Sequence, residues 1–371
     1  MNQIRILYVV PNLRVCNGVA SYAMNYFRHI DKNKIKIDFL LLNNIETPYY
    51  DEIKEAGSEI TVLPSIKNGL RNYINAINKV FDANYKYDIV HSHVINVGAI
   101  ILKCAKKKGV KIRILHNHAT KSANNKWKKI RNDIIAPIAK YYATDYFACS
   151  KMAGDSLFKG KKYEIINNAI EINKYEFNDE IRNKVRNELN ISDKFVIGCV
   201  GRITYEKNPG FVLDILTKLT EINKNVILLW VGTGNLENSI KESSQKLGIN
   251  KNIIFMGDRN DVHKLYQAMD VFLLTSYYEG FGIVNIEAQV AGLPTFVSDV
   301  VPIDTKVTDL IYYLSLKIGA GEWAEKIIDN GVNKNRKRNY GFLVKENRYD
   351  IDEEANMLEN KYNNMLENYK E

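Results

Sequence analysis

Short apolar, β-branched segments alternate with longer amphipathic segments along the chain. In the first half, helical patterns such as Val19–Ile30 and Val97–Lys107 separate the apolar segments. A strand that is apolar on both faces belongs in a parallel sheet covered by helices. We therefore predict strands over Ile4–Val10, Ile35–Leu42, Glu59–Leu63, Asp88–His91, Ile112–Leu115 and Asp145–Ala148.

The second half repeats this alternation. Helical patterns such as Pro209–Leu219 and Leu236–Leu247 again separate short apolar runs. The strands predicted there are Val196–Val200, Val226–Val231, Ile253–Met256, Val271–Thr275 and Thr295–Val297.

The length and composition support two folded domains. The chain has 371 residues, of which 46% are hydrophobic, so each half can build a core. Polar residues at Asn167–Tyr175 interrupt the pattern. We predict an α/β protein with Rossmann-like domains over residues 1–170 and 171–349, and a polar amphipathic helix within residues 350–371. Ligands of such sheets bind beyond the carboxyl ends of the strands.

The sequence lacks the marks of a membrane-spanning or disulfide-stapled protein. Its apolar runs fall short of the ~20 residues of a transmembrane helix, and no charged-then-apolar leader precedes the first strand. The four cysteines contain no C-x-x-C pair, which argues against a disulfide framework or a zinc site. We expect a cytoplasmic protein, either in the cytosol or peripheral on the inner face of the cell membrane.

Basic residues are concentrated in the first half. Residues 1–170 hold 27 of the 52 lysines and arginines but only 13 of the 43 acidic residues. This excess suits anionic lipid, nucleic acid or a phosphorylated acceptor, and a lysine-rich solvated surface accounts for it equally well. The segment Lys121–Arg131, with Trp127 among its cations and Ile134 beyond it, suits an anionic membrane surface. No nucleic-acid recognition module is present, so we expect no nucleic-acid partner.

Two H-x-H pairs lie at the ends of neighbouring predicted strands. His91 and His93 belong to one pair, and His116 and His118 follow the next strand. Alternate residues of an extended segment point the same way, but no carboxylate or thiolate accompanies these rings. We therefore favour hydrogen-bonding or structural roles over a metal site. Gly18, where the first helix begins, lets a phosphate or sugar approach backbone N–H groups, or is simply a helix-start glycine.

Two cations follow the first strand of the second half. Gly201 and Arg202 come directly after it, and Lys207 lies just before a helix. Fixed cations beside a helix N-terminus can bind a diphosphate without a metal, and a surface pair is the alternative. Gly232 and Arg259 follow the next two strands and are weaker candidates for nucleotide contacts.

The most specific pattern follows the strand Val271–Thr275. Gly280 and Gly282 lie where a helix must begin, which frees backbone N–H groups to donate to an anion. Glu279 stands in the turn and Glu287 lies in the helix. Carboxylates bind sugar hydroxyls through charge-assisted hydrogen bonds, so this turn is a candidate sugar site.

The motif E-G-F-G-x-x-x-x-E-A-x-x-x-G-x-P, with its E-x7-E spacing, resembles the signature of the retaining GT-B glycosyltransferases of family four. The similarity covers nearly the whole chain. The stretches at Gly18, His116–His118 and Ser298–Leu316 look most like the capsular and exopolysaccharide subgroup. The resemblance implies two Rossmann-like domains whose parallel sheets face across a cleft, and a last helix that crosses back to the N-terminal domain.

The resemblance also implies the reaction. A hexose or N-acetylhexosamine would pass from a nucleoside-diphosphate sugar, by family habit UDP-linked, to a glycan or lipid-linked acceptor. Front-face attack would retain the anomeric configuration, and the departing phosphate would take the acceptor proton. We expect no metal and no other cofactor, because the D-x-D triplet Asp350–Asp352 lies at the start of the tail helix, away from any strand end.

The resemblance assigns a role to each candidate residue. Glu279 would contact the donor hexose and Glu287 the ribose hydroxyls. Arg202 and Lys207 would neutralise the diphosphate, and His118 would contact the sugar near its reactive face. The remaining donor contacts would come from Gly18, Gly201, Gly232, Arg259, Gly280, Phe281, Gly282 and Ile283, and acceptor-side contacts from His93 and His116.

Two departures and two alternatives qualify this interpretation. Thr275-Ser276 and Asn167-Asn168 replace the family's usual Pro-Ser and Asn-Gly, so the donor pocket can differ in detail. A sugar-nucleotide epimerase of the same fold would use the histidine turns as acid and base. A non-catalytic nucleotide-sugar-binding subunit of a polysaccharide assembly complex would show no turnover, but the complete set of charged site residues argues for an enzyme.

Overall fold

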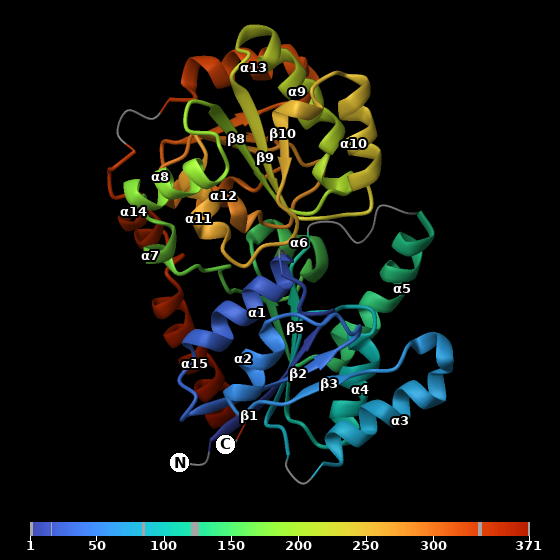
Figure 1. The fold of residues 1–371 in the computed structure, drawn as a ribbon. Helices are drawn as coiled ribbons and strands as arrows, with labels where there is room; N and C mark the ends of the chain where they lie inside the picture. Colours follow the sequence, from blue (N-terminus) through green and yellow to red (C-terminus); the bar gives the residue numbers. More distant parts are fainter. Residues whose placement is uncertain (1–2, 16, 84–85, 120–125, 333–335, 370–371) are drawn as a thin grey trace. The chain divides into compact units, whose positions relative to one another are not determined.

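A computed structural model shows that the chain forms two units (Figure 1). The structure describes residues 3–369 except 16, 84–85, 120–125 and 333–335. One unit consists of Met1–Ala169 together with Ile351–Glu371, and the other of Ile170–Asp350. The chain therefore passes between the units twice.

The N-terminal unit contains a parallel sheet. Its seven described strands follow the order β3-β2-β1-β4-β5-β6-β7, so the direction of addition reverses between β1 and β4. Such a reversal creates a switch point at the carboxyl ends of the strands. The strands are β1 Ile4–Val10, β2 Ile35–Leu41, β3 Ile60–Val62, β4 Ile89–Ser92, β5 Ile112–Asn117, β6 Asp145–Ala148 and β7 Glu164–Ile165.

Helices cover both faces of this sheet. In Figure 1, α1 and the dark red α15 lie on one face, and α3, α4 and α5 lie on the other. The last helix is part of this unit, because Ile351, Leu358 and Tyr362 are buried in the same core as Tyr8. The helices are α1 Gly18–His29, α2 Tyr49–Glu55, α3 Leu70–Phe81, α4 Gly98–Lys107, α5 Lys126–Tyr142, α6 Lys151–Phe158 and α15 Ile351–Asn368.

The C-terminal unit contains a second parallel sheet, in the order β10-β9-β8-β11-β12-β13, with its switch point between β8 and β11. One apolar core gathers around Trp323 and another around Tyr266. The strands are β8 Phe195–Val200, β9 Val226–Val231, β10 Ile253–Phe255, β11 Val271–Leu274, β12 Thr295–Ser298 and β13 Ile311–Leu314. The helices are α7 Ile172–Tyr175, α8 Asp179–Glu188, α9 Pro209–Ile222, α10 Glu237–Lys246, α11 Val262–Ala268, α12 Ile283–Val290, α13 Gly319–Asn330 and α14 Tyr340–Glu346.

The predicted strands all exist, but the edge strands β7 and β13 were not predicted. β7 has two residues, too few to show a period, and three of the four residues of β13 are only half-buried. The end predicted for β5 was also wrong, because the strand continues to Asn117 and so contains His116. Among the cysteines that the structure describes, Cys104 and Cys199 are free and buried, and Cys149 is buried.

Candidate active site

The switch point of the C-terminal sheet brings Lys207 and Glu279 together. Lys207 ends a short 3-10 turn after β8, and Glu279 lies in the loop between β11 and α12. Lys207 Nζ is 2.5 Å from Glu279 Oε2, and the Ser276 hydroxyl donates to the same oxygen at 3.1 Å. Only 21% and 12% of the two charged side chains are exposed, so the pair is partly shielded from water. Ser276 was not among the predicted residues.

Hydrogen bonds hold these two segments in register. The backbone N–H of Tyr277 donates to the Glu206 carbonyl at 2.8 Å. The Thr275 hydroxyl donates to the Lys207 carbonyl at 3.2 Å. The turn that carries Lys207 is therefore tied to the loop that carries Glu279, so the ion pair is preorganised rather than a chance meeting of two long side chains.

The glycines after β8 and β9 allow a close approach of backbones. Gly201 and Gly232 have φ angles of +144° and +123°, which favour glycine. A Cβ on Gly232 would lie 2.4 Å from the Gly201 carbonyl oxygen, and one on Gly234 would lie 2.1 Å from the Ile203 carbonyl oxygen. This packing alone requires glycine here, whether or not a ligand approaches the turns.

Helix α12 begins at a glycine in the left-handed conformation. Gly282 is its N-cap, with φ +83°, and among the described residues no side chain caps this end. The positive end of the helix dipole therefore lies beside Glu279, where an anion would be favourable. Phe281 is buried, and its ring centroid lies 5.4 Å from that of Tyr349. Gly280 and Ile283 flank this turn.

Glu287 is a buried carboxyl group on α12. It is 8% exposed, and the Tyr266 hydroxyl donates to its Oε2 at 2.8 Å. Burial raises the pKa of Glu287 from 4.5 to about 7, although hydrogen bonds from Tyr266 and Tyr175 oppose the shift. The group therefore titrates near neutral pH. Tyr266 could not be predicted as a site residue, because its place in the sequence is that of an ordinary helix-core residue.

Arg202 is exposed directly after β8 and lines a small pocket together with Lys207 and Thr275. Two predicted residues lie outside this cluster. The Arg259 guanidinium makes two hydrogen bonds of 2.8 Å to Asp261 in its own loop, so its charge is already paired. Gly18 is exposed in the first turn of α1.

The histidines of the N-terminal unit form one cluster. The rings of His91 and His93 stack with centroids 4.3 Å apart, and those of His116 and His118 stack at 4.0 Å. His116 is fully buried, whereas His118 is partly exposed, so His118 is the better placed of the two to meet a ligand. Burial lowers the pKa of all four, that of His118 to about 3, so the rings are neutral at physiological pH.

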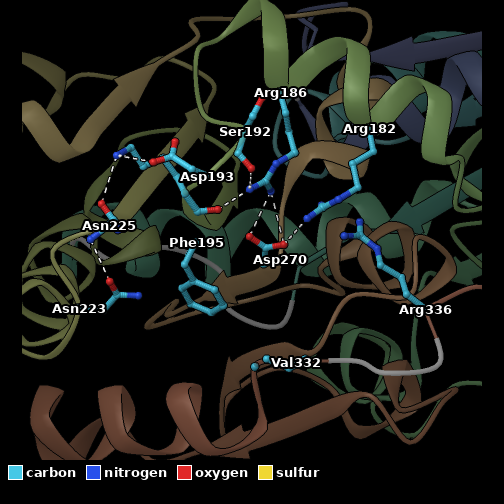
Figure 2. Close-up of a pocket in the computed structure, with 12 residues that line it drawn as sticks. Arg182, Arg186, Ser192, Asp193, Phe195, Asn223, Asn225, Asp270, Val332 and Arg336 are labelled. Atoms are coloured by element: carbon cyan, nitrogen blue, oxygen red, sulfur yellow. Dashed lines mark hydrogen bonds and ion pairs between the residues drawn. The ribbon is translucent and has the colours of Figure 1, made fainter.

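A cavity of about 500 Å³ lies at the amino ends of the strands in the C-terminal unit (Figure 2). Arg182 and Arg186 surround Asp270 there, with ion-pair distances of 2.5 and 3.2 Å. These two arginines and Arg336 also donate to backbone carbonyls, including that of Met269 from both Arg182 and Arg336. The guanidinium groups therefore satisfy protein acceptors, which indicates a structural role for this cavity.

Comparison with known proteins shows similarity to glycosyltransferases. Residues 181–348, most of the C-terminal unit, match the family described as glycosyl transferases group 1. The chain is 29% identical to EpsF of Bacillus subtilis (strain 168) over 98% of this chain and 97% of that protein. It is 32% identical to the capsular polysaccharide biosynthesis glycosyltransferase CapM of Staphylococcus aureus, over 52% of this chain and 54% of CapM.

Two further matches concern the donor and the acceptor of related proteins. The UDP-Gal:alpha-D-GlcNAc-diphosphoundecaprenol alpha-1,3-galactosyltransferase of Escherichia coli is 28% identical over 58% of each chain. The structure of Anabaena Alr3699/HepE in complex with UDP-glucose superposes with a TM-score of 0.80 at 15% identity, over 98% of this chain and 100% of that one. The latter shows the fold, which is GT-B. Residues 181–348 are thus similar to glycosyl transferases group 1, and the similar proteins include a glycosyltransferase of capsular polysaccharide biosynthesis.

Across the helices that the structure describes, none has the length and apolar character needed to cross a bilayer.

Proposed function

We propose that the protein is a retaining glycosyltransferase of surface polysaccharide synthesis. It transfers a hexose or N-acetylhexosamine from a UDP-linked donor to a glycan or lipid-linked acceptor. The observation that carries the proposal is the Lys207–Glu279 pair beside the start of α12. A cation and a helix N-terminus together suit a diphosphate, and the carboxylate beside them suits sugar hydroxyls.

The donor and the acceptor are proposed by similarity. A structure of the same fold holds UDP-glucose, and the name of the Escherichia coli relative gives it UDP-galactose and a diphosphoundecaprenol-linked acceptor. CapM supports the assignment to surface polysaccharide synthesis.

The mechanism we propose rests on preorganised charge. As the anomeric C–O bond breaks, negative charge grows on the diphosphate. Lys207, Arg202 and the N–H groups at the start of α12 stabilise this charge, so they stabilise the transition state more than the ground state. Glu279 orients Lys207 and accepts hydrogen bonds from the sugar, and Glu287 accepts them from the ribose. The departing phosphate takes the acceptor proton on the face of the sugar that it leaves, so the anomeric configuration is retained. This step requires no divalent metal.

The first experiment is donor binding and turnover with UDP-, GDP- and ADP-sugars. We expect saturable binding of a UDP-sugar to the wild type and a loss of kcat of about 10²–10³ in Lys207→Met, the cost of one transition-state donor. Lys218→Met is the matched control, because Lys218 pairs with Glu221 on the exposed face of α9. The product is examined by NMR for its anomeric configuration.

Each part of the proposal has an outcome that contradicts it. An inverted product contradicts retention, and a product that is still a nucleotide sugar indicates an epimerase. Binding without turnover on any acceptor indicates a non-catalytic subunit. Activity that is lost in EDTA and restored by Mn²⁺ contradicts metal independence.

We further propose that α5 rests on an anionic membrane surface. Residues 121–125 of the predicted segment Lys121–Arg131 lie outside the described residues, but the rest of it begins α5, which carries an exposed apolar stripe. Ile130, Ile134, Ile138 and Tyr141 are 52%, 64%, 46% and 71% exposed. Exposed lysines at the end of α4 lie beside this stripe, with Lys106 Nζ 5.2 Å from the Tyr141 ring. An apolar stripe flanked by cations suits an anionic leaflet.

Vesicle sedimentation tests this surface. We expect binding to vesicles that contain phosphatidylglycerol and little binding to phosphatidylcholine alone. The double change Ile134→Asn with Ile138→Asn should weaken binding at least tenfold. Ile222→Asn, at a 58% exposed isoleucine of the other unit, should leave it unchanged. Equal binding to both kinds of vesicle would contradict the proposal.

A further inference from the structure

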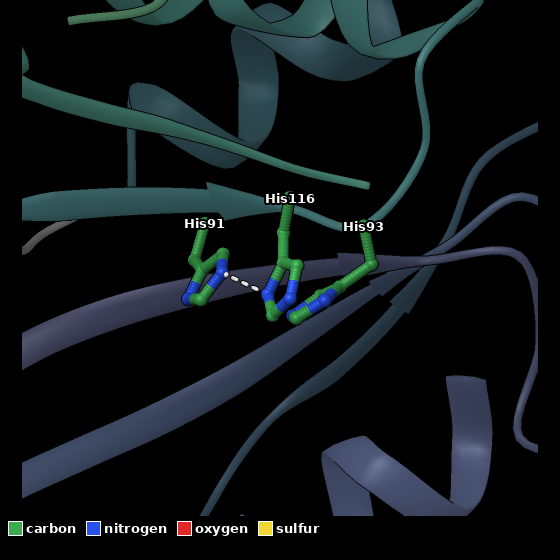
Figure 3. Close-up of side chains that lie close together, drawn as sticks. All are labelled: His91, His93 and His116. Atoms are coloured by element: carbon green, nitrogen blue, oxygen red, sulfur yellow. Dashed lines mark hydrogen bonds between the residues drawn. The ribbon is translucent and has the colours of Figure 1, made fainter. Parts of the chain in front are cut away.

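The buried histidine cluster has the composition of a metal site. Figure 3 shows the rings of His91, His93 and His116 side by side at the ends of β4 and β5. One ring nitrogen from each residue can be chosen so that all three lie within 4.8 Å of one another. We propose that these three histidines bind one transition-metal ion, Zn²⁺ being the natural candidate. The proposal does not depend on the function proposed above.

The closest pair already has the spacing of metal ligands. His91 Nε2 and His116 Nδ1 are 3.1 Å apart. Two nitrogens bound to tetrahedral Zn²⁺ at the usual bond length lie about 3.3 Å apart. The ring of His93 stacks on that of His91 and lies 5.2 Å from that of His116. Closing the triangle requires the His93 ring to turn toward this pair.

Hydrogen bonds orient the rings as outer partners orient metal ligands. His91 Nδ1 lies 2.7 Å from the Tyr362 hydroxyl, and that hydroxyl lies 3.0 Å from the hydroxyl of Tyr8. His93 Nδ1 lies 2.9 Å from His118 Nε2. If each Nδ1–H donates outward, the Nε2 atoms of His91 and His93 carry free lone pairs. Histidine ligands of metals are usually fixed by such a bond on the other nitrogen.

Buried ring nitrogens of this cluster lack hydrogen-bond partners among the described residues, which indicates a ligand that the protein itself does not supply. His93 Nε2 and His116 Nε2 are inaccessible to water and have no hydrogen-bond partner among the residues that the structure describes. Leaving a buried polar atom unsatisfied costs about 1–3 kcal/mol, so such atoms in one cluster need an explanation. A cation bound by His93 Nε2 would satisfy that nitrogen, and binding through His116 Nε2 in place of Nδ1 would satisfy the other. His116 can offer either of its nitrogens, since Nδ1 faces His91 and Nε2 is unpartnered.

The ligand set selects the kind of ion. Imidazole nitrogens suit Zn²⁺, Co²⁺, Ni²⁺ and Cu²⁺, whereas Ca²⁺ and Mg²⁺ require oxygen ligands. The aromatic rings of Tyr8, Tyr22 and Phe147 surround the histidines. The ion would join the ends of two strands and, through Tyr362, the last helix. Its role would be structural.

Metal uptake tests the proposal directly. The full chain, with its affinity tag removed, is made metal-free and dialysed against Zn²⁺, and bound metal is measured by mass spectrometry. We expect one equivalent, a melting temperature that rises with Zn²⁺, and a tetrahedral visible spectrum with Co²⁺. His93→Gln and His116→Gln should lose uptake. His29→Gln and His263→Gln, at histidines outside the cluster, should retain it.

Several results would overturn the proposal. Wild-type protein that takes up no stoichiometric metal would show that the orphaned nitrogens bind water instead. Uptake that persists in both cluster variants would place the ion elsewhere. If these variants fail to fold, Tyr362→Phe decides: loss of an outer partner should weaken the affinity about 10- to 100-fold while the core keeps its volume. An unchanged affinity in that folded variant would contradict the arrangement. Because the readout is metal content, these results are independent of sugar transfer.

Discussion

Neighbouring groups give the two glutamates of one motif different properties. Glu279 has a lysine at 2.5 Å, whereas Glu287 is buried and accepts hydrogen bonds from the neutral hydroxyls of Tyr266 and Tyr175. The sequence predicted both glutamates as site residues. It could not predict their environments, because Lys207 and Tyr266 are distant along the chain and only the fold brings them near.

The first prediction concerns the titration of Glu287. Its pKa rises from 4.5 to about 7 on folding, so the folded state binds the extra proton between these values. The contribution of Glu287 to the free energy of unfolding is therefore full below the pKa of the unfolded state. It is lost as the pH rises through the pKa of the folded state, and the loss is about 3 kcal/mol in total. Urea unfolding from about pH 5 to about pH 8 should show this decline in the wild type and a flatter profile in Glu287→Gln.

The comparison variant is Glu367→Gln, at an exposed glutamate near the end of α15. It should follow the wild-type pH profile. Parallel profiles for the wild type and Glu287→Gln would show that this carboxyl group does not titrate in the expected window.

The second prediction concerns the glycine after β9. In Gly232→Ala, the new Cβ would meet the Gly201 carbonyl at 2.4 Å, and the φ of +123° strains any other residue. We expect a loss of more than about 2 kcal/mol in the free energy of unfolding, together with weaker donor binding. Gly210→Ala, in the first turn of α9 with open space around it, should be neutral or stabilising by up to about 1 kcal/mol. Similar melting temperatures for the two variants would contradict this account.

Segments of secondary structure were predicted where their own residues determine them. The central strands are apolar on both faces and were found within a few residues of their ends, as with β9 at Val226–Val231. The edge strands β7 and β13 were missed because pairing with a neighbour, not their own pattern, defines them. The arginines around Asp270 were also missed. They lie more than 80 residues away from it along the chain, so only the fold brings them near.

The third prediction concerns how these arginines join α8 to β11. Asp270 pairs with Arg182 and Arg186, and its Oδ2 accepts the N–H of Val196 at 2.8 Å. Asp270→Ala would leave these donors uncompensated in a partly buried place, which should cost about 3 kcal/mol. Denaturant unfolding measures the loss. Asp299→Ala, at an exposed turn, serves as the control and should change stability by less than about 0.5 kcal/mol.

At the scale of the whole molecule, the N-terminal unit is built from two separate parts of the chain. Its core needs Leu358 and Tyr362 of α15 as well as Tyr8 of β1. The amphipathic pattern predicted the helix, but only the family resemblance suggested where it goes. An amphipathic surface specifies that a helix must be covered, not which of two sheets covers it.

The fourth prediction follows from this division. Tyr362→Ala should destabilise the N-terminal unit by about 3–5 kcal/mol, because it removes a fully buried ring. Hydrogen exchange followed by mass spectrometry should show lost protection in peptides from Met1–Ala169 and unchanged protection in peptides from Ile170–Asp350. Tyr369→Ala, at an exposed tyrosine just beyond α15, should change neither. Uniform loss of protection would mean that the units unfold together.

The discontinuous unit also fixes an order of events on the ribosome. The segment Ile170–Asp350 can complete its own core as soon as it emerges, whereas the sheet translated before it must wait for Ile351–Glu371. At typical rates of translation that wait is on the order of 10–40 s. During it the surface that will receive Leu358 and Tyr362 is open to chaperones, and a nonsense codon even late in the message would leave the part of the enzyme made first unfinished.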